Sequence, residues 1–297
     1  MFRSVLIPID FFASSQRVAE RAALLPLTEG ARLTLLHVVP KLLPREAQRR
    51  AESDAQEALS EAKERLARAL PPTVKVKTAV TSGTAALEIA KQAKSLRTEL
   101  IVMGRVGARA VRDLFIGSTA ERVVRQAQCP VLVVRLPAHH GYQRPALALD
   151  LDEAAPAALA FALRMLPAPP PPMLLVHAYD APFHGLIYPS LAPDEAKEYR
   201  RYYKQKAAHG FARLLAAQRA GGLPNAEGAR WVLKVQYGSP RALIPKAVAK
   251  HRADLLVLGT HGRSGVAQAF LGTVAGDVLR DVPCDVLVVP PRRGRPR

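Results

Sequence analysis

Two segments of the chain repeat one pattern of glycines that is suited to holding a phosphate group. GRVGARAVRDLFIGS begins at Gly104 and GTHGRSGVAQAFLGT begins at Gly259, and both read Gly, two residues, Gly, nine residues, Gly and a hydroxyl residue. Glycines let the backbone approach a ligand closely, and free N–H groups at the start of a helix attract phosphate. The pattern therefore predicts a nucleotide-type site in at least one of the two segments.

Each glycine segment follows a short apolar run, LIVMG or LLVLG, that is typical of a buried parallel strand. In open α/β sheets, ligands bind at the carboxyl ends of such strands. After the last glycine of each segment, Ser118 and Thr119 in one and Thr273 in the other open stretches of helical character. Their hydroxyl groups can add hydrogen-bond donors for a phosphate. A strand end, a glycine loop and a helix start are the parts of a phosphate cradle.

The sequence indicates a duplicated unit, because matching residues of the two copies lie at one offset in the first part and at a second offset in the rest. Asp10 and Asp150 end the apolar runs VLIPID and ALALD, 140 residues apart, and His37 and His177 keep the same offset. From Gly83 onward the offset is 155, as it is for the two glycine segments. The second copy therefore has fifteen extra residues after its histidine, in two segments rich in Pro and Gly that flank a helix.

These offsets predict two domains of similar size. We expect residues 1–136 to form the first and residues 144–291 the second, with residues 137–143 as the linker and residues 292–297 as a basic tail. The extra residues of the second copy are expected to be loops at its surface.

Short apolar runs alternate with longer amphipathic stretches in each copy. Helical periodicity covers residues 45–70 and the stretches that follow Gly83 and Gly238, the last of which contains Pro245. The predicted strands lie near residues 3–9, 32–39, 73–80, 99–103 and 130–135, and near 144–149, 172–178, 230–236, 254–258 and 285–289. The alternation predicts an α/β fold with two tandem copies of an open, doubly wound five-stranded parallel sheet.

Composition and charge narrow the class of protein. The chain has 297 residues, 49% of them hydrophobic, but no run of about eighteen uncharged apolar residues, so no membrane span is predicted. Its first apolar run is short and meets Asp10, unlike a signal peptide, and we expect a cytoplasmic protein. The net charge of +18 favours an anionic partner. The basic residues are dispersed, however, and no aromatic stacking stripe or recognition helix stands out, which disfavours nucleic acid.

The two halves resemble the universal stress protein family in its tandem two-domain form. The resemblance covers nearly the whole chain and rests on the repeated G-x2-G-x9-G-[S/T], on Asp10 and Asp150, on LLHVV and LLVHAY, and on CPVLVV and CDVLVV. It implies an adenine-nucleotide alpha-hydrolase-like fold and ATP, with or without Mg²⁺, as the bound cofactor. It also implies a stress-response regulator with weak or no catalysis. In such a chain, the last strands can pair internally as a pseudo-dimer, and the whole can form a homodimer.

The resemblance also implies a set of cofactor-binding residues, which lie at strand ends and in the glycine segments. In the first copy they are Pro8, Ile9, Asp10, Val38, Met103, Gly104, Arg105, Gly107, Gly117, Ser118 and Thr119. In the second copy they are Leu149, Asp150, Ala178, Leu258, Gly259, Thr260, Gly262, Arg263, Gly272, Thr273 and Val274.

Each copy departs from the family pattern at a different place. The second copy has the more typical loop, GTHGRSG, but Ala148 stands where Pro8 stands in the first. The first copy has the better first strand, but Val106 and Ala108 replace the histidine and arginine of the second loop. We expect at least one of the two sites to bind nucleotide, and the sequence leaves open which.

No signature of efficient catalysis is present: P-loop, zinc-protease, nucleophile-elbow and kinase motifs are all missing from the sequence. Whether the protein is an enzyme is left open, with slow ATP hydrolysis as the upper limit. One alternative is a slow ATPase or a phosphotransfer protein modified at Ser118, Thr119 or Thr273. Another is a binding protein for a different anion, an acidic lipid or a nucleic acid.

Several residues also have simpler interpretations. Asp10 and Asp150 can serve as caps of the helices that follow them, and His37 and His177 are interpreted as hydrogen-bonded core histidines. The two cysteines precede strand-like runs and are interpreted as buried, unreactive thiols. No metal site is predicted, because the remaining histidines, His139, His140 and His184, have no ligand partners at suitable spacing.

Overall fold

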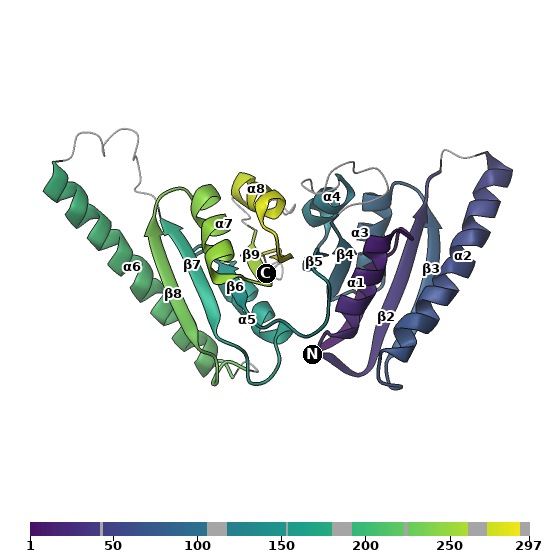
Figure 1. The fold of residues 1–297 in the computed structure, drawn as a ribbon, viewed down its shortest axis with the longest axis horizontal. Coiled ribbons are helices and arrows are strands. Elements are labelled where there is room, and N and C mark those ends of the chain that lie inside the picture. Colours follow the sequence, from purple (N-terminus) through teal and green to yellow (C-terminus); the bar gives the residue numbers. More distant parts are fainter. Residues whose placement is uncertain are drawn as a thin grey trace, which may run out of the picture.

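The computed structural model describes residues 1–41, 44–105, 118–152, 154–179, 192–222, 225–260 and 272–291. Its strands are β1 (Phe2–Pro8), β2 (Leu27–Val39), β3 (Lys75–Ser82), β4 (Leu100–Gly104), β5 (Val131–Val134), β6 (Pro145–Ala148), β7 (Met173–Tyr179), β8 (Trp231–Tyr237), β9 (Leu255–Gly259) and β10 (Asp285–Val289). Its helices are α1 (Ala13–Ala23), α2 (Arg45–Arg68), α3 (Ala85–Ser95), α4 (Ser118–Gln126), α5 (Ala155–Met165), α6 (Pro193–Ala220), α7 (Pro240–His251) and α8 (Thr273–Asp281). Figure 1 shows the two halves side by side, with α2 and α6 on their outer sides.

The ten strands of the described residues form one open sheet, in the order β3-β2-β1-β4-β5-β10-β9-β6-β7-β8. Within each half the strands pair in parallel and the order is the same, so the predicted α/β class and the doubly wound parallel arrangement are confirmed. At the centre, β5 and β10 pair antiparallel, with Leu132 opposite Leu287 and Val133 opposite Val286. The last strands of the two halves thus join the two five-stranded sheets into one.

The observed strands match the predicted ones closely, apart from the start of β2. This strand begins at Leu27, five residues before the predicted start, and its pairing with β1 shifts register between Phe2 and Ser4. The early part reads LTEGAR and contains Gly30 at φ +70°, so it lacks the apolar alternation by which a strand is recognised. In the second half, α7 runs through Pro245 to His251, whereas residues 180–191 of the predicted insertion lie outside the described residues.

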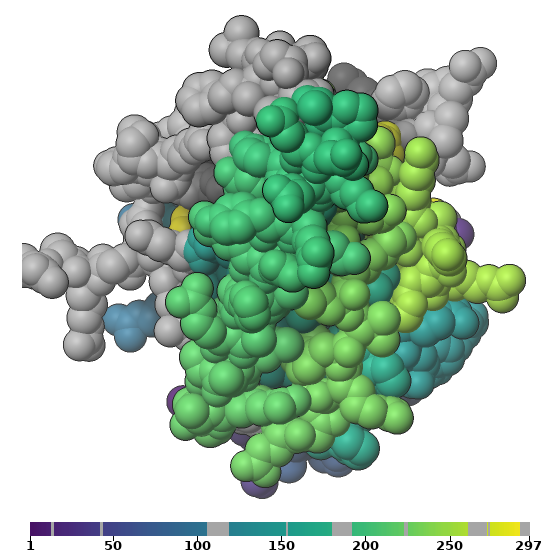
Figure 2. Space-filling model, turned by 90° about the vertical axis from the view of Figure 1, so that its left-hand side faces the viewer, coloured from purple at the N-terminus to yellow at the C-terminus, as the bar shows by residue number. Residues whose placement is uncertain are grey.

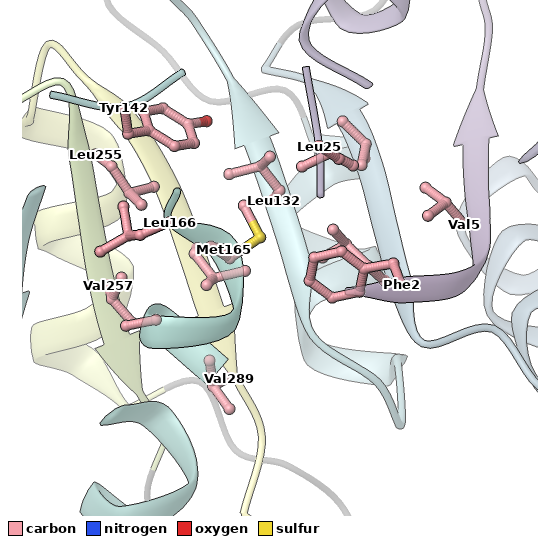
Figure 3. Close-up of a cluster of buried hydrophobic side chains, with 14 of the residues drawn as sticks. Phe2, Val5, Leu25, Leu132, Tyr142, Met165, Leu166, Leu255, Val257 and Val289 are labelled. Carbon is pink, nitrogen blue, oxygen red and sulfur yellow. The ribbon is translucent and has the colours of Figure 1, made fainter. Parts of the chain in front are cut away.

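Apolar side chains cover both faces of the sheet. Leu132 of β5 belongs to one buried cluster and its neighbours Val131 and Val133 to the other, because successive side chains of a strand point to opposite faces. Figure 3 shows Leu132 between Phe2 of the first half and Met165 of the second. The core is therefore continuous across the joint between β5 and β10. This double coverage explains why the strands read as unbroken apolar runs.

A buried polar cluster lies at the joint between the halves, around Asp285. This carboxylate is fully buried and lies 3.1 Å from the Arg21 Nε atom of α1, in ion-pair contact. It also accepts the hydroxyl of Tyr142 at 2.8 Å and the backbone N–H groups of Arg135 and Leu136 at 2.7 and 2.9 Å. Burial outweighs these four interactions and raises the pKa of Asp285 above its usual value. The cluster ties the first half and the linker to the last strand of the second.

Arg135 and Arg164 make further links between the halves. The two Nη atoms of Arg135 donate to the carbonyl oxygens of Leu279 and Val282, at the end of α8, and burial lowers the pKa of this arginine to about 10. Arg164 of α5 donates to the Met1 carbonyl oxygen at 2.7 and 2.9 Å. Arg135 of the first half thus binds the carboxyl end of α8, and Arg164 of the second half binds the backbone directly before β1.

The two cysteines occupy equivalent places, and the predicted burial is confirmed for Cys284, whereas Cys129 is only half-buried. Burial raises the pKa of both thiols to about 12, so both stay protonated at neutral pH, in line with the expected unreactive thiols. No helix among the described residues is long and apolar enough to cross a membrane.

Candidate functional site

A pocket of about 210 Å³ opens at the carboxyl ends of β1, β2 and β4 in the first half. It brings together eight of the predicted cofactor-binding residues, Pro8, Ile9, Asp10, Val38, Met103, Gly104, Arg105 and Thr119. Six further residues complete its lining, Ser15, Leu36, His37, Ala85, Ile89 and Ala120. Gly107 and Gly117 lie outside the described residues, and Ser118 is described only as the first residue of α4.

Asp10 supplies the carboxylate of this pocket, and Ser15 holds it in place. The Ser15 hydroxyl donates to Asp10 Oδ1 at 2.5 Å and accepts the backbone N–H of Asp10 at 3.1 Å. The same Oδ1 accepts the backbone N–H of Phe12 at 3.2 Å. Phe12 is the N-cap residue of α1 and makes no side-chain cap, so Asp10 orders the turn before the helix rather than capping it. Ser15 is not among the predicted site residues, because its only sequence signal is a hydroxyl group five residues after Asp10.

His37 is both hydrogen-bonded, as predicted, and part of the pocket lining, which was not predicted. Its Nδ1 atom lies 2.7 Å from the carbonyl oxygen of Ile9. Because a carbonyl oxygen only accepts, Nδ1 carries the hydrogen, and in the neutral ring Nε2 is left as an acceptor. The ring of Phe11 lies 4.5 Å from the His37 ring, tilted by 31°. Phe11 itself has φ +61°, so strained backbone directly follows Asp10.

The start of α4 lies at the same end of the sheet, and its charges are arranged in pairs. Glu121 in the first turn would repel a phosphate, but its Oε1 accepts from Arg125 at 2.8 Å and its Oε2 lies 3.7 Å from Arg280 of α8. Thr119 of the same turn lines the pocket. The start of α4 therefore combines the N–H groups of a helix N-terminus with a carboxylate that two arginines neutralise, which suits an anionic ligand.

In the second half, the predicted residues also gather at strand ends. β6 and β9 pair with Ala148 opposite Leu258, which places Leu149 and Gly259 at one edge, and Ala178 lies near the end of β7. Gly272 and Val274 flank the start of α8, and Thr273 is its first residue. Gly262 and Arg263 lie outside the described residues.

The histidine and carboxylate of the second half keep part of the first half's geometry. His177 Nδ1 lies 3.0 Å from the carbonyl oxygen of Leu149, the counterpart of the bond between His37 and Ile9. Asp150 accepts the backbone N–H of Leu151 at 3.0 Å, and its side chain is 57% exposed. The hydrogen-bonded core histidine predicted here is confirmed. The Asp150 carboxylate is largely exposed and has one oxygen 3.9 Å from His177 Nδ1, whereas the Asp10 carboxylate lines the first pocket.

Three polar groups of the first pocket are replaced in the second half. At the 140-residue offset Ala155 stands for Ser15, and at the 155-residue offset Val274 stands for Thr119. Thr260 stands for Arg105 and is buried, with its N–H bonded to the Val289 carbonyl oxygen at 3.0 Å. The two halves thus share a backbone but differ in the donors and acceptors that they offer a ligand.

Metal ligands do not gather in the described part of the chain, where no group of three His, Cys, Asp or Glu side chains could hold an ion. His184 lies outside the described residues. The polar set of the first pocket, a carboxylate, a hydroxyl pair, an imidazole and a guanidinium, suits a ligand with hydroxyl and phosphate groups.

Comparison with known proteins agrees with this picture. The model of the universal stress protein family matches residues 1–135 and 141–290. A universal stress protein from Archaeoglobus fulgidus DSM 4304 has a similar solved structure, with a TM-score of 0.69, 19% identity and coverage of 97% of this chain and 96% of that chain. A structure from Pseudomonas aeruginosa UCBPP-PA14, named for the same family, has a TM-score of 0.60 at 19% identity and covers 98% and 94%. At this identity the two structures establish the fold alone.

A curated relative from Staphylococcus epidermidis, also named for this family, is 44% identical over 57 residues. The match covers 19% of this chain and 34% of the relative. The chain therefore spans about a third of the length of the curated relatives that it matches.

Proposed function

Because the chain belongs to the universal stress protein family, in two consecutive copies, we propose that its first half binds ATP and acts as a regulatory module with weak or no catalysis. The observation that carries the proposal is the pocket at the carboxyl ends of β1, β2 and β4, whose largely apolar lining includes a few polar and charged side chains. Open α/β sheets bind nucleotides at this edge. The second half is proposed to bind more weakly or not at all.

The pocket residues match the parts of a nucleotide. Asp10, oriented by Ser15, is placed to accept hydrogen bonds from ribose hydroxyl groups. His37 offers a further acceptor at Nε2, because its Nδ1–H is committed to Ile9. Arg105 and the first turn of α4 supply positive charge and N–H groups for phosphates, with or without Mg²⁺.

The size of the pocket fits this assignment in part. Small-molecule sites usually measure about 300–1,000 Å³, so the described pocket of about 210 Å³ accommodates a portion of a nucleotide. We assign it the nucleoside. Gly107 and Gly117, expected to approach the phosphates, belong to the segment outside the described residues.

A regulatory role fits the chemistry of the lining better than catalysis. Among the described lining residues, Asp10 is the one carboxylate, and its Oδ1 already accepts two hydrogen bonds. A general base for water must be aimed at the reacting phosphate, whereas Asp10 and His37 lie in the part of the pocket that we assign to the nucleoside. Bound nucleotide would instead stabilise one arrangement of the β1–α1 turn, where Phe11 is strained and half-exposed.

The pairing of β5 with β10 is proposed to replace the pairing of two separate subunits. We assign residues 1–136 and 144–291 to the two domains so joined, and the cytoplasm as the place of action. The antiparallel joint leaves β3 and β8 as the outer edges of the sheet.

Calorimetric titration with ATP and Mg²⁺ tests the proposal, with Asp10→Ala compared against the matched variant Asp150→Ala. Losing a charged hydrogen-bond acceptor costs about 1.5–3 kcal/mol, so Asp10→Ala should raise Kd about 10- to 100-fold. Asp150→Ala should change it less than about twofold. An equal loss of ATP affinity in both variants, or no ATP binding by the wild type, would contradict the proposal.

A further inference from the structure

Helix α6 carries a strong and uneven positive charge. Its 28 residues include seven Lys or Arg and three acids, Asp194, Glu195 and Glu198, all within the first six residues. Residues 199–220 contain six basic residues and no acid. The Glu195 carboxylate accepts the backbone N–H of Ala192 at 2.9 Å, so it serves the start of the helix. Most of the length of α6 therefore carries basic side chains and no acidic ones.

The matching helix of the first half shows that the fold does not require this charge. α2 lies between the same two strands of its half as α6 does, and its 24 residues include six basic and six acidic side chains. Some of these pair along the helix, as Arg65 and Glu61 do at 3.5 Å. A neutral outer helix serves the first half, so the basic one of the second half calls for a separate explanation.

Tyrosines lie among the cations of α6. The rings of Tyr199 and Tyr203 lie 4.7 Å apart, and the ring of Tyr202 is perpendicular to that of Tyr203 at 5.2 Å. Lys206 Nζ lies 5.9 Å from the centroids of both Tyr202 and Tyr203. Tyr202 is 58% exposed. A large exposed ring held by a second ring and flanked by a cation is a surface on which a flat aromatic group can stack.

Aromatic and basic side chains form a continuous stripe on the exposed side of α6. Tyr202, Lys206, His209 and Arg213 are all exposed and follow one another at spacings of four, three and four residues, which puts them on one stripe. The stripe is about 16 Å long, from a rise of about 1.5 Å per residue. Figure 2 shows α6 along the outer face of the second half, open to solvent over its length. We call this stripe, together with the exposed Arg201 and Lys204, the α6 face.

We propose that the α6 face binds single-stranded nucleic acid. Its cations neutralise backbone phosphates, and the Tyr202 ring stacks on an unpaired base, the combination by which proteins hold single strands without reading their sequence. A duplex keeps its base faces stacked inside, so it can use the cations but not the ring. The sequence alone disfavoured nucleic acid because no aromatic stacking stripe stood out, and the common face of these residues and the exposure of Tyr202 become visible only in the folded helix.

Fluorescence anisotropy with a labelled poly(dT) oligonucleotide, and with its poly(dA) duplex, tests this proposal at low and moderate salt. The wild type should prefer the single strand, with affinity falling as salt rises. Tyr202→Ala should weaken binding to the single strand about fivefold or more, whereas Tyr202→Phe should keep it, because stacking needs the ring and not the hydroxyl. The duplex should not respond to either change.

Charge-reversal variants test whether single-strand binding depends on the α6 face or on the basic residues spread over the whole chain. Arg201→Glu with Lys204→Glu should abolish most single-strand binding, whereas the matched double variant on α2, Arg49→Glu with Arg50→Glu, should change it less than about twofold. A chain ending at Pro291, without the basic tail, should bind as the wild type does. Equal losses on α2 and α6, loss with the tail, indifference to Tyr202, or tighter binding to anionic lipid vesicles would each overturn the proposal. Thermal unfolding of every variant verifies that the fold is kept.

Discussion

The two halves of this chain share a scaffold down to individual hydrogen bonds. His37 and His177 bond equivalent carbonyl oxygens, and Gly83 and Gly238 both have positive φ at the start of the third helix of their half. The acids that precede β4 and β9 also match: Glu99 accepts the backbone N–H of Arg3 at 2.7 Å, and Asp254 accepts that of Gln143 at 2.6 Å. These shared features hold strand ends and turns in place. We infer that these shared hydrogen bonds and turns stabilise the fold common to both halves.

The halves differ where a ligand or partner would touch them. The polar pocket groups Ser15 and Thr119 of the first half become Ala155 and Val274 in the second. The neutral outer helix α2 becomes the basic α6. Because the two halves share one backbone arrangement, the fold accepts either set of side chains, with Ala155 packed into the core of the second half and Val274 packed against it. We infer that the first half is adapted to the nucleotide and the second to a larger anionic partner.

The largest effect is expected at the joint between the halves. Asp285→Ala removes the partner of buried Arg21 and the acceptor of the Tyr142 hydroxyl, and it should lower the free energy of unfolding by about 3–5 kcal/mol. The counterpart of Asp285 in the first half is Pro130, where Pro130→Ala should cost less than about 1 kcal/mol. Urea denaturation measures both. Similar costs at the two positions would show that the joint does not depend on this cluster.

The pH dependence of stability tests the role of Asp285 in a second way. A carboxyl whose folded pKa lies above its unfolded value binds protons more tightly in the folded state, so stability falls as pH rises from about 3.8 through the folded pKa. Asp285→Asn cannot ionise and should lack this decline. Over that pH range, the unfolding free energy of the wild type should therefore fall relative to that of the variant. A shift in the opposite direction would mean that Arg21 outweighs burial.

Exchanging pocket residues between the halves should move the nucleotide preference. Ser15→Ala with Thr119→Val gives the first pocket the side chains of the second and should raise the Kd for ATP about 5- to 50-fold, because two hydrogen-bonding groups are lost. The reciprocal variant, Ala155→Ser with Val274→Thr, should leave the wild-type affinity within about twofold. Calorimetric titration compares the two. If only the reciprocal variant alters binding, the nucleotide belongs to the second half.

The smallest effect is expected at two arginines that the halves share. Arg97 and Arg252, after α3 and α7, have φ of 49° and 50°, a left-handed conformation that side chains disfavour. Arg97→Gly and Arg252→Gly should each raise the free energy of unfolding by about 0.5–1 kcal/mol, since glycine lacks the strain but is freer in the unfolded chain. Thermal unfolding should give equal gains in the two halves. Unequal gains would contradict the view that shared features belong to the common scaffold.

Much of the fold could be predicted from the sequence, because parallel strands covered on both faces leave long apolar runs. The start of β2 at Leu27 could not, since its irregular pairing and polar residues hide the strand period. In the first pocket the strand-end residues were predicted, whereas the place of His37 depends on how β2 ends beside Ile9. Asp285 and Tyr142 are 143 residues apart, and no sequence period connects them.

The central claim is that one half of this duplicated chain holds the nucleotide. Equilibrium dialysis of the wild-type chain against radiolabelled ATP with Mg²⁺ counts the tight sites directly. One equivalent per chain, lost in Asp10→Ala and kept in Asp150→Ala, is the result that the pocket around Asp10 in the first half predicts. Two equivalents, or one equivalent lost only in Asp150→Ala, would contradict the claim.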